Sequence, residues 1–170
     1  MIRPITDADV EAAAALRREA LLDAPLAFAA SPEGDLGSDP EAIQARIADA
    51  PDSMTFGAFE EGRLVGLVSV FRETHAKRAH RANVFAMYVT AAQRRRGFAA
   101  QLLEAAILHA EAQGIAWLRL GVSESAPSAR RLYEAAGFQA IGEEPDALRH
   151  GGQSASETQM ALALPRPTVR

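Results

Sequence analysis

The second half of the chain alternates between short apolar segments and amphipathic ones, and this alternation most constrains its fold. The expected order is strand, helix, strand, helix, strand and strand, over residues 82–90, 98–113, 116–122, 127–136, 138–142 and 158–164. In the longer helix, apolar residues recur at helical spacing, and Gly114 supplies a C-terminal stop. Strands that alternate with helices in this way indicate a sheet on which the helices pack.

The first half supplies further strands to the same sheet. Strands are expected over residues 2–5, 55–60 and 63–72, and helices over 9–22 and 40–49. Thr6 and Asp7 can cap the first helix, and Glu61 and Gly62 form the turn of a hairpin. The nearly all-apolar strand over residues 82–90 is expected at the centre of the sheet. The whole order predicts a mixed α+β or α/β fold.

Composition limits the domain organisation and the kinds of site. A length of 170 residues suits one domain, which we expect over residues 1–164 with a C-terminal tail over 165–170. Because the chain has no cysteine, disulfides and cysteine-ligated metal centres are excluded. The four histidines show no paired spacing of the kind that metal ligands need, so no metal is expected; they are His75, His80, His109 and His150.

Charge and hydropathy limit the expected partners. The formal net charge is -4 at pH 7, which argues against general nucleic-acid binding. No apolar run approaches the roughly 18 residues that a membrane-spanning helix requires. The first residues also lack the apolar stretch of a secretory signal. We therefore expect a cytoplasmic protein with no nucleic-acid or membrane partner.

A cluster of three arginines, Arg94, Arg95 and Arg96, stands between the central strand and the next helix, and Gly97 follows it. The start of a helix presents unpaired backbone N–H groups and the positive end of the helix dipole, which suit an anion such as a pyrophosphate. Gly97 permits a close backbone approach, and the small Ala99 avoids crowding phosphates. Taken alone, the loop fits a solvated basic turn equally well, because arginine is the usual basic residue throughout this chain.

Two motifs in register carry a resemblance to a known family. Residues 94–99 match a phosphate loop of the form Arg/Gln-x-x-Gly-x-Gly/Ala. The later signature, Asn-x-x-Ala-x-x-Leu-Tyr followed by Gly-Phe, is met at Ala129, Leu132, Tyr133, Gly137 and Phe138. The chain therefore resembles the GCN5-related N-acetyltransferase (GNAT) superfamily of acetyl-CoA-dependent enzymes, firmly over residues 82–142 and more loosely elsewhere. The resemblance implies the GNAT fold, an α/β (α+β) fold whose mixed, mostly antiparallel sheet of six to seven strands is flanked by about four helices.

The resemblance also implies a cofactor site. Backbone amides in the residues that match the phosphate loop would hold the pyrophosphate of coenzyme A; these are Arg94, Arg95, Arg96, Gly97, Phe98 and Ala99. The strands over residues 82–90 and 116–122 would splay apart and open a cleft for the pantetheine arm. Main-chain groups at a bulge, in Met87, Tyr88 and Val89, would pair with that arm and with the thioester oxygen, an arrangement that stabilises an oxyanion.

The resemblance implies a proton donor for catalysis but does not identify a general base. The hydroxyl of Tyr133 would protonate the departing thiolate; the alternative is a tyrosine that packs one face of the last helix. Many relatives carry a glutamate on the strand before the phosphate loop, but residues 82–89 contain no acid here. Glu124 and Glu73 are the candidate bases, acting through a water, and the alternative for each is an ordinary surface acid. An acceptor amine that is already partly neutral needs no dedicated base.

The second motif departs from the family at Ala126, where the family has an asparagine. Without that side chain, contacts to the cofactor are expected to be weaker or altered. Ser125 is expected to contact the cofactor and to cap the last helix, with Pro127 in its first turn. Ala129 is expected to line the cofactor.

The acceptor region is expected beside the turn-rich loop over residues 30–40. Phe28 and Glu33 occupy the zone where the family receives its acceptor, although Phe28 equally fits a loop residue packed on the core. The segment over residues 151–157 lacks the aromatic residues that some relatives carry before the last strand.

The function implied by the resemblance is transfer of acetyl from acetyl-CoA to a primary amine, by direct attack in a ternary complex and without a metal. The acceptor is expected to be a small amine, an amino acid, an antibiotic-like compound or a peptide or protein N-terminus. The missing asparagine and strand glutamate keep open a different function, a catalytically degenerate acyl-CoA-binding regulatory module. Homodimers are common among relatives, so a homodimer is a further possibility.

Overall fold

The computed structural model describes residues 1–165, whose strands form one mixed sheet in the order β1-β2-β3-β4-β5-β7-β6. The strands are β1 (Ile2–Pro4), β2 (Ser53–Glu60), β3 (Arg63–Arg72), β4 (Arg81–Val89), β5 (Trp117–Ser123), β6 (Gln139–His150) and β7 (Gln153–Ala163). Neighbouring strands are antiparallel except β4 and β5. The predicted mostly antiparallel sheet, with its apolar strand β4 at the centre, is confirmed. Of the predicted tail, residues 166–170 lie outside the described residues.

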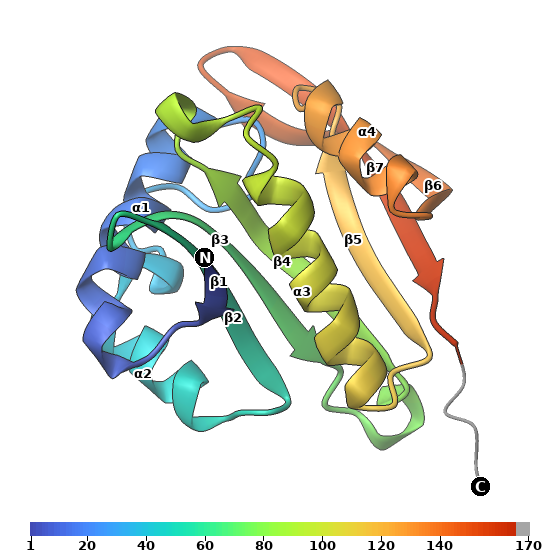
Figure 1. Cartoon of the computed structure of the whole chain (residues 1–170). Helices are drawn as coiled ribbons and strands as arrows, with labels where there is room; N and C mark the ends of the chain where they lie inside the picture. The colour runs from blue at the N-terminus through green and yellow to red at the C-terminus, as the bar shows by residue number, and fades with distance from the viewer. Residues whose placement is uncertain (166–170) are drawn as a thin grey trace, which may run out of the picture.

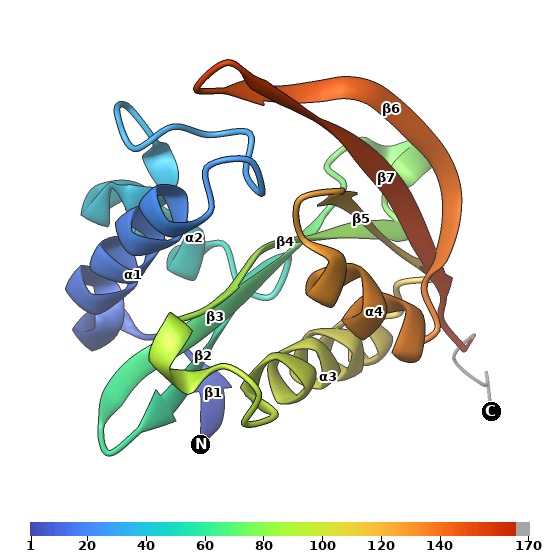
Figure 2. The same cartoon turned by 90° about the horizontal axis from the view of Figure 1, so that it is seen from above.

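Helices cover both faces of this sheet. They are α1 (Val10–Asp23), α2 (Pro40–Ala48), α3 (Phe98–Ala112) and α4 (Pro127–Ala135), each within one residue of its predicted ends. Figure 2 shows α1 and α2 on one face and α3 and α4 on the other. The stripe of α3 that contains Leu102, Leu103 and Ala106 is buried in the main core, where each fully buried leucine contributes about 2 kcal/mol. Within residues 1–165, none of the helices has the length and apolar character needed to cross a membrane.

Strands β4 and β5 pair only at their beginnings. Residues Arg81, Ala82 and Asn83 face Trp117, Leu118 and Arg119, and no later residues of the two strands are paired. Figure 1 shows the strands close together at that end and far apart at the other, where β4 leads into the loop before α3. The predicted splaying of these strands is therefore confirmed, and it opens the sheet beside the arginine-rich loop.

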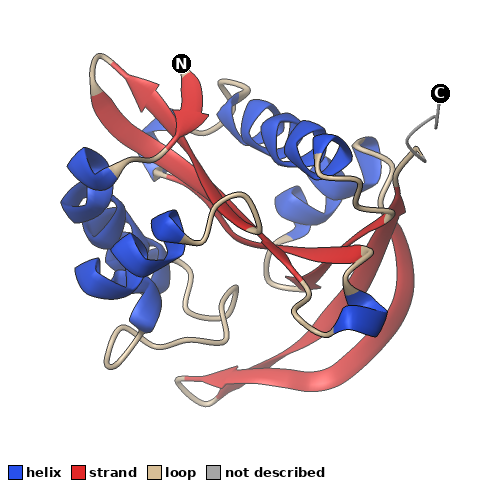
Figure 3. Cartoon of the chain, turned by 90° about the horizontal axis from the view of Figure 1, so that it is seen from below, coloured by secondary structure: helices blue, strands red, loops and turns tan. Residues whose placement is uncertain are grey.

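The last two strands are longer than the sequence predicted. The expected strands covered residues 138–142 and 158–164, whereas β6 and β7 form a hairpin that includes most of the polar segment between them. The turn is made by Gly151 and Gly152, both of which adopt positive φ. The prediction was wrong here because much of β6 is exposed on both faces and has no apolar alternation. In Figures 2 and 3 the tip of this hairpin lies across from the loop between α1 and α2.

The start of α1 is fixed by a capping box, in which Thr6 is the N-cap residue, as predicted, and Asp9 is the acidic partner. The buried Asp9 carboxylate accepts hydrogen bonds from Arg3 at 2.7 and 2.9 Å, and from the backbone N–H of Thr6 at 2.8 Å. A short 3₁₀ turn, Asp7–Asp9, precedes the helix. Hydrogen bonding to Arg3 holds the pKa of Asp9 well below its ordinary value. The contact ties β1 to α1.

Candidate functional site

The separation of β4 from β5 leaves part of the β4 backbone open on one edge. Beyond Asn83, the main-chain groups of β4 that point toward β5 have no strand partner in the described sheet. On its other edge β4 continues to pair with β3 as far as Val89. Unpaired donors and acceptors in a row are suited to an extended ligand that completes the sheet hydrogen bonds.

This open edge runs into the start of α3. Gly97 is the N-cap residue, with φ of +84°, and no side chain caps the first N–H groups of the helix. A side chain at position 97 would be strained in this conformation, although the nearest atom to an added Cβ, Nε2 of Gln101, is 3.6 Å away. The first N–H groups of α3 are thus left without a side-chain cap, and such groups favour an anion.

Arg94 is already committed to protein contacts. Its guanidinium pairs with Asp23 at the end of α1, and its Nε donates to the Val89 carbonyl at 3.0 Å. The guanidinium carbon lies 5.5 Å from the centre of the Tyr88 ring. The hydrogen bond from Arg94 lowers the pKa of Asp23. The side chain of Arg94 therefore anchors the loop to α1.

The other two arginines of the cluster differ from each other. Arg96 makes a two-pronged ion pair with Glu60 of β2, at 2.5 Å for both contacts. Arg95 adopts φ of +60° and is exposed, and it makes no hydrogen bond or ion pair with another residue in the described part of the chain. Of the three, Arg95 is thus the guanidinium open to a ligand.

A bulge interrupts β4 close to the middle of the open edge. Leu67 pairs with Tyr88 and Ser69 with Phe85, which leaves one β3 residue opposite both Ala86 and Met87. Ala86 has φ of +55°, so the strand turns sharply at this point. The resemblance implied a bulge at residues 87–89, and the observed bulge begins one residue earlier.

The side chain of Tyr88 points away from the cleft, toward α1. Its hydroxyl lies 3.0 Å from a carboxylate oxygen of Glu19 and 3.0 Å from one of Asp23. Burial and these two carboxylates raise the pKa of Tyr88 above its ordinary value. Only the main chain of Tyr88 is therefore left for a ligand on the open edge.

Tyr133 in α4 is buried in the main core. Its ring packs edge-on against that of Phe138, with the centres 5.9 Å apart. Burial raises the pKa of Tyr133 to about 12, so the phenol carries its proton at neutral pH. These contacts are those of the packing role, and the proton-donor role of Tyr133 stays a prediction.

Comparison with known families identifies the chain. A family model described as the acetyltransferase (GNAT) family matches residues 18–138, which include both motifs. This chain belongs to the GNAT family. The resemblance predicted from the two motifs is confirmed.

Solved GNAT structures have the same fold. A GNAT from Kribbella flavida is 27% identical over 96% of this chain and 97% of its own, with a TM-score of 0.81. The yncA protein of Salmonella typhimurium, solved with its cofactor acetyl-CoA, is 20% identical over 100% and 96%, with a TM-score of 0.86. A phosphinothricin acetyltransferase from Sinorhizobium meliloti, in complex with acetyl-CoA, is 18% identical over 96% and 88%, with a TM-score of 0.85. A search of curated protein sequences finds no match.

The two candidate bases of this GNAT chain lie in different places. Glu124 follows β5, and its carboxylate accepts the backbone N–H of Ser156 in β7 at 2.7 Å. Glu73 accepts a hydrogen bond from Asn83 at 3.1 Å, near the closed end of the β4–β5 pair. That bond from Asn83 lowers the pKa of Glu73, which disfavours it as a base. Only Glu124 is therefore near the open end of the strands.

The loop between β5 and α4 departs from the expected capping. Ala126 is the N-cap residue of α4 and offers no side-chain cap, whereas Ser125 was predicted to serve as one. The Ser125 hydroxyl instead donates to the carbonyl of Leu26 at 3.0 Å, which joins this loop to the segment after α1. Ala129 is half-buried and packs against the main core. Among residues 1–165, no three His, Cys, Asp or Glu side chains gather as metal ligands.

The predicted acceptor residues are divided between core and solvent. Phe28 packs against a small core cluster beneath α1, and the guanidinium of Arg17 lies 5.1 Å from its ring centre. These contacts agree with the packing interpretation of Phe28, and its acceptor role stays a prediction. Glu33 is exposed, and it makes no hydrogen bond or ion pair among the described residues.

Sequence reasoning missed a pocket of about 280 Å³ between the helices α1 and α2 and the sheet. We call it the α1–α2 pocket; it is lined by Ile5, Ala13, Arg17, Asp35, Leu36, Gly37, Ile43, Arg46, Thr55, Leu67, Ser69, Phe85 and Ala86. The last of these is the bulge residue of β4. These residues come from seven separate segments, so no local motif marks the pocket. The turn-rich loop over residues 30–40 was the one available signal.

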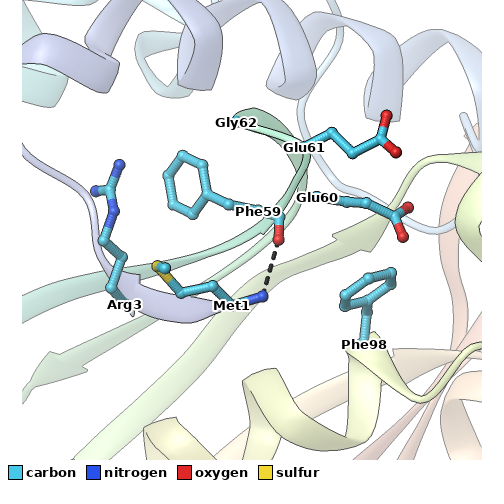
Figure 4. Close-up of a pocket in the computed structure, with 7 residues that line it drawn as sticks. All are labelled: Met1, Arg3, Phe59, Glu60, Glu61, Gly62 and Phe98. Atoms are coloured by element: carbon cyan, nitrogen blue, oxygen red, sulfur yellow. Dashed lines mark hydrogen bonds between the residues drawn. The ribbon is translucent and has the colours of Figure 1, made fainter.

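A second hollow lies beside the start of α3 and is drawn in Figure 4. It measures about 460 Å³ and is lined by Met1, Arg3, Phe59, Glu60, Glu61, Gly62 and Phe98. The terminal amino group of Met1 donates to the Phe59 carbonyl at 2.8 Å, and the Arg3 guanidinium lies 3.8 Å from the Phe59 ring centre. Because Glu60 and Glu61 line this hollow, it does not suit a phosphate group.

Proposed function

We propose that this GNAT chain transfers the acetyl group of acetyl-CoA to a primary amine by direct attack in a ternary complex. One observation carries the proposal: β4 separates from β5 directly beside the uncapped start of α3. A row of free main-chain groups thus leads into an anion-binding loop. An extended ligand with a pyrophosphate at one end matches that combination. The acetyl-CoA in the compared structures named above supports the same donor.

This chain would hold acetyl-CoA, the acetyl donor, mainly through its backbone atoms. Main-chain N–H groups over residues 94–99 would contact the pyrophosphate, with Arg95 adding a charged side-chain contact. Main-chain groups of β4 at Met87 to Val89 would pair with the pantetheine arm. At the bulge a donor N–H would lie near the thioester oxygen, where negative charge develops during attack.

The reaction needs one bond formed, one broken and two proton movements. The nitrogen lone pair of the acceptor attacks the thioester carbonyl carbon; a C–N bond forms and the C–S bond breaks. The proton lost from nitrogen passes to water or to Glu124, and Tyr133 supplies a proton to the departing thiolate. Because Tyr133 is buried and protonated at neutral pH, it is suited to donate rather than to accept. Holding both reactants in one cleft supplies much of the remaining acceleration.

A binding measurement followed by a turnover measurement tests the proposal. We expect acetyl-CoA to raise the melting temperature of the protein and to bind with one-to-one stoichiometry in calorimetry. We then expect free thiol to appear when a primary amine is added, at a rate that depends on the amine. No binding of acetyl-CoA would contradict the proposal.

A degenerate acyl-CoA-binding module is the second candidate, and two observations favour it. Ala126 stands at the N-cap of α4 where the family has asparagine, and β4 carries no acidic side chain. This candidate predicts stabilisation by acetyl-CoA without thiol release from any amine in a broad panel. The same two measurements therefore separate the candidates.

A further inference from the structure

We propose that the α1–α2 pocket selects small primary amines that also carry an anionic group, such as a carboxylate, and that Arg46 binds that group. The inference rests on the proposed function, because it names the acceptor class of the same reaction. It concerns residues that neither sequence motif contains. Its lining residues include members of α1 and α2, and Figure 2 shows these two helices on the face of the sheet opposite α3.

The pocket reaches the place where the reaction would occur. Ala86, the positive-φ residue of the β4 bulge, forms part of its wall, next to Phe85. The same bulge is where the thioester oxygen is proposed to lie, on the open edge of β4. An amine in the pocket could therefore approach the thioester from the α1 side of the sheet.

The charged groups of the pocket leave a net positive charge. Arg17 donates to Asp35 through Nε at 3.0 Å, and the two side chains are only 14% and 7% exposed. Burial works to raise the pKa of Asp35, but hydrogen bonds from Arg17 and Ser38 outweigh it and hold that pKa below its ordinary value. Arg17 and Asp35 therefore neutralise each other. Arg46 is the second cation, and Asp35 is the one carboxylate among the lining residues.

Arg46 has no partner of its own in the described part of the chain. Its side chain is half-buried on α2 and lines the pocket, and its guanidinium makes no hydrogen bond or ion pair with another described residue. Burial lowers the pKa of Arg46; the nearby Asp35 carboxylate opposes this effect and the Arg17 cation adds to it, and neither makes a hydrogen bond to the Arg46 guanidinium. Arg46 also lines a smaller hollow, together with Ile47 and Ala50, so it lies between two cavities. An anionic ligand in the pocket would give the Arg46 guanidinium a hydrogen-bonded partner of opposite charge.

Two neutral hydroxyl groups on the sheet line the same pocket as the Arg46 guanidinium. The hydroxyls of Thr55 and Ser69 lie 2.7 Å apart, on adjacent strands β2 and β3, and both line the pocket. Two hydroxyls that bond each other retain one free donor hydrogen. That donor can join Arg46 in binding a carboxylate oxygen.

The wall of the pocket is fixed in shape before any ligand arrives. A Cβ added at Gly37 would lie 2.9 Å from Nε of Arg17 and 3.0 Å from Oδ2 of Asp35, so the backbone packs directly on this ion pair. Ser38 donates to Asp35 at 2.8 Å and completes the arrangement. A preformed site loses little entropy when it binds.

The volume and charge favour a small free acid over a macromolecule. A pocket of about 280 Å³ accommodates an amino-acid-sized molecule. In a protein or peptide N-terminus the carboxyl next to the amine is an amide, so it offers Arg46 no charge. The pocket therefore predicts discrimination between an amino acid and its amide.

The test measures binding of matched amines to the full-length protein with coenzyme A present, so that no acetyl transfer is required. L-leucine, L-phenylalanine and L-methionine are each compared with the corresponding amide, and 2-aminoethylphosphonate is compared with ethanolamine. Dissociation constants are obtained by ligand-observed NMR titration. In at least one pair we expect the anionic member to bind about 10-fold to 100-fold tighter, as a charge-assisted hydrogen bond would give. The phosphonate pair distinguishes a carboxylate site from a general anion site.

Variants of Arg46 test whether its charge recognises the anionic group or whether the residue only supports the fold. Arg46→Gln is expected to reduce the preference to about twofold or less, because its side chain keeps the stem but carries no charge. Arg46→Lys keeps the charge and is expected to give an intermediate preference. Arg78→Gln, at an exposed arginine outside the pocket, is the matched control and is expected to change nothing. Unchanged melting temperatures establish that the variants fold.

Three results would overturn the inference: amides that bind as tightly as acids, a preference that survives Arg46→Gln, or no binding by any anionic amine. Thiol release from acetyl-CoA is measured separately in the same samples. Release from neutral amines alone would overturn the anionic acceptor and leave acetyl transfer standing. Tight, Arg46-dependent binding of an acid with no thiol release from any amine would support the acceptor site and contradict the transfer reaction.

Discussion

Asp23, the last residue of α1, forms an ion pair with Arg94 in the loop before α3. The two residues are 71 positions apart, and the pair joins the helix on one face of the sheet to the loop proposed to bind phosphate. Arg94 also lies over the Tyr88 ring and donates to the Val89 carbonyl. Its side chain therefore positions the loop instead of facing a ligand.

This division of roles predicts that the three arginines contribute unequally to acetyl-CoA binding. Arg95→Gln should raise the dissociation constant about fivefold to tenfold, because its guanidinium is free for a phosphate contact. Arg96→Gln should change it by about twofold or less, because Arg96 is occupied by Glu60. Calorimetry at low and physiological salt checks both values. A larger effect from Arg96→Gln than from Arg95→Gln would contradict the assignment.

Tyr133→Phe should lower kcat by about 100-fold while leaving the dissociation constant of acetyl-CoA unchanged, because the phenol is proposed to act on the leaving thiolate. The burial that raises the pKa of Tyr133 to about 12 also predicts the pH profile. Activity should rise with pH as the acceptor amine loses its proton, and Tyr133 should cause no decline below about pH 11. Full turnover by a folded Tyr133→Phe variant would exclude the proton-donor role and leave the packing role with Phe138.

Ala126→Asn should improve both the helix and the cofactor site. An asparagine at the N-cap of α4 would satisfy an uncapped N–H group, which contributes about 1 kcal/mol and raises the melting temperature by about 2–4 °C in a domain of this size. It would also restore the side chain that the family places beside the cofactor, so tighter acetyl-CoA binding is expected. Ala126→Ser, which caps the helix with a shorter side chain, is the control. Equal affinity in all three proteins would show that position 126 does not contact the cofactor.

The contact between Asp9 and Arg3 predicts how stability changes with acid. The pKa of Asp9 is lowered in the folded protein, so its contribution is present above the unfolded value of about 4 and is lost as the pH falls below that value. Asp9→Asn should therefore lower the melting temperature most at neutral pH, and the difference from the unmodified protein should shrink below about pH 4. Asp7→Asn, at an exposed neighbour, should have little effect at either pH. A difference that grows as the pH falls would contradict the sign.

Local patterns in the sequence predicted the elements but not the contacts between them. The helix α3 and the hairpin partner β3 were predicted almost to the residue, because apolar periodicity, Gly114 and the Glu61–Gly62 turn are local signals. The ion pairs of Arg17 with Asp35 and of Arg94 with Asp23 were not predicted, because their partners are 18 and 71 residues apart. The motif over residues 94–99 is local in the same way, so the sequence predicted the loop proposed to bind the cofactor. The α1–α2 pocket, whose lining comes from distant segments, became visible only in the folded chain.

The central claim is that this chain moves an acetyl group from acetyl-CoA to a primary amine. The most direct measurement incubates the protein with acetyl-CoA and a panel of small amines, and follows thiol release together with the mass of each amine. We predict thiol release that equals, mole for mole, the amine found to carry one added acetyl group, and rates of both signals about 100-fold lower in Tyr133→Phe. Acetyl-CoA that binds the protein but acetylates no amine in the panel would contradict the claim.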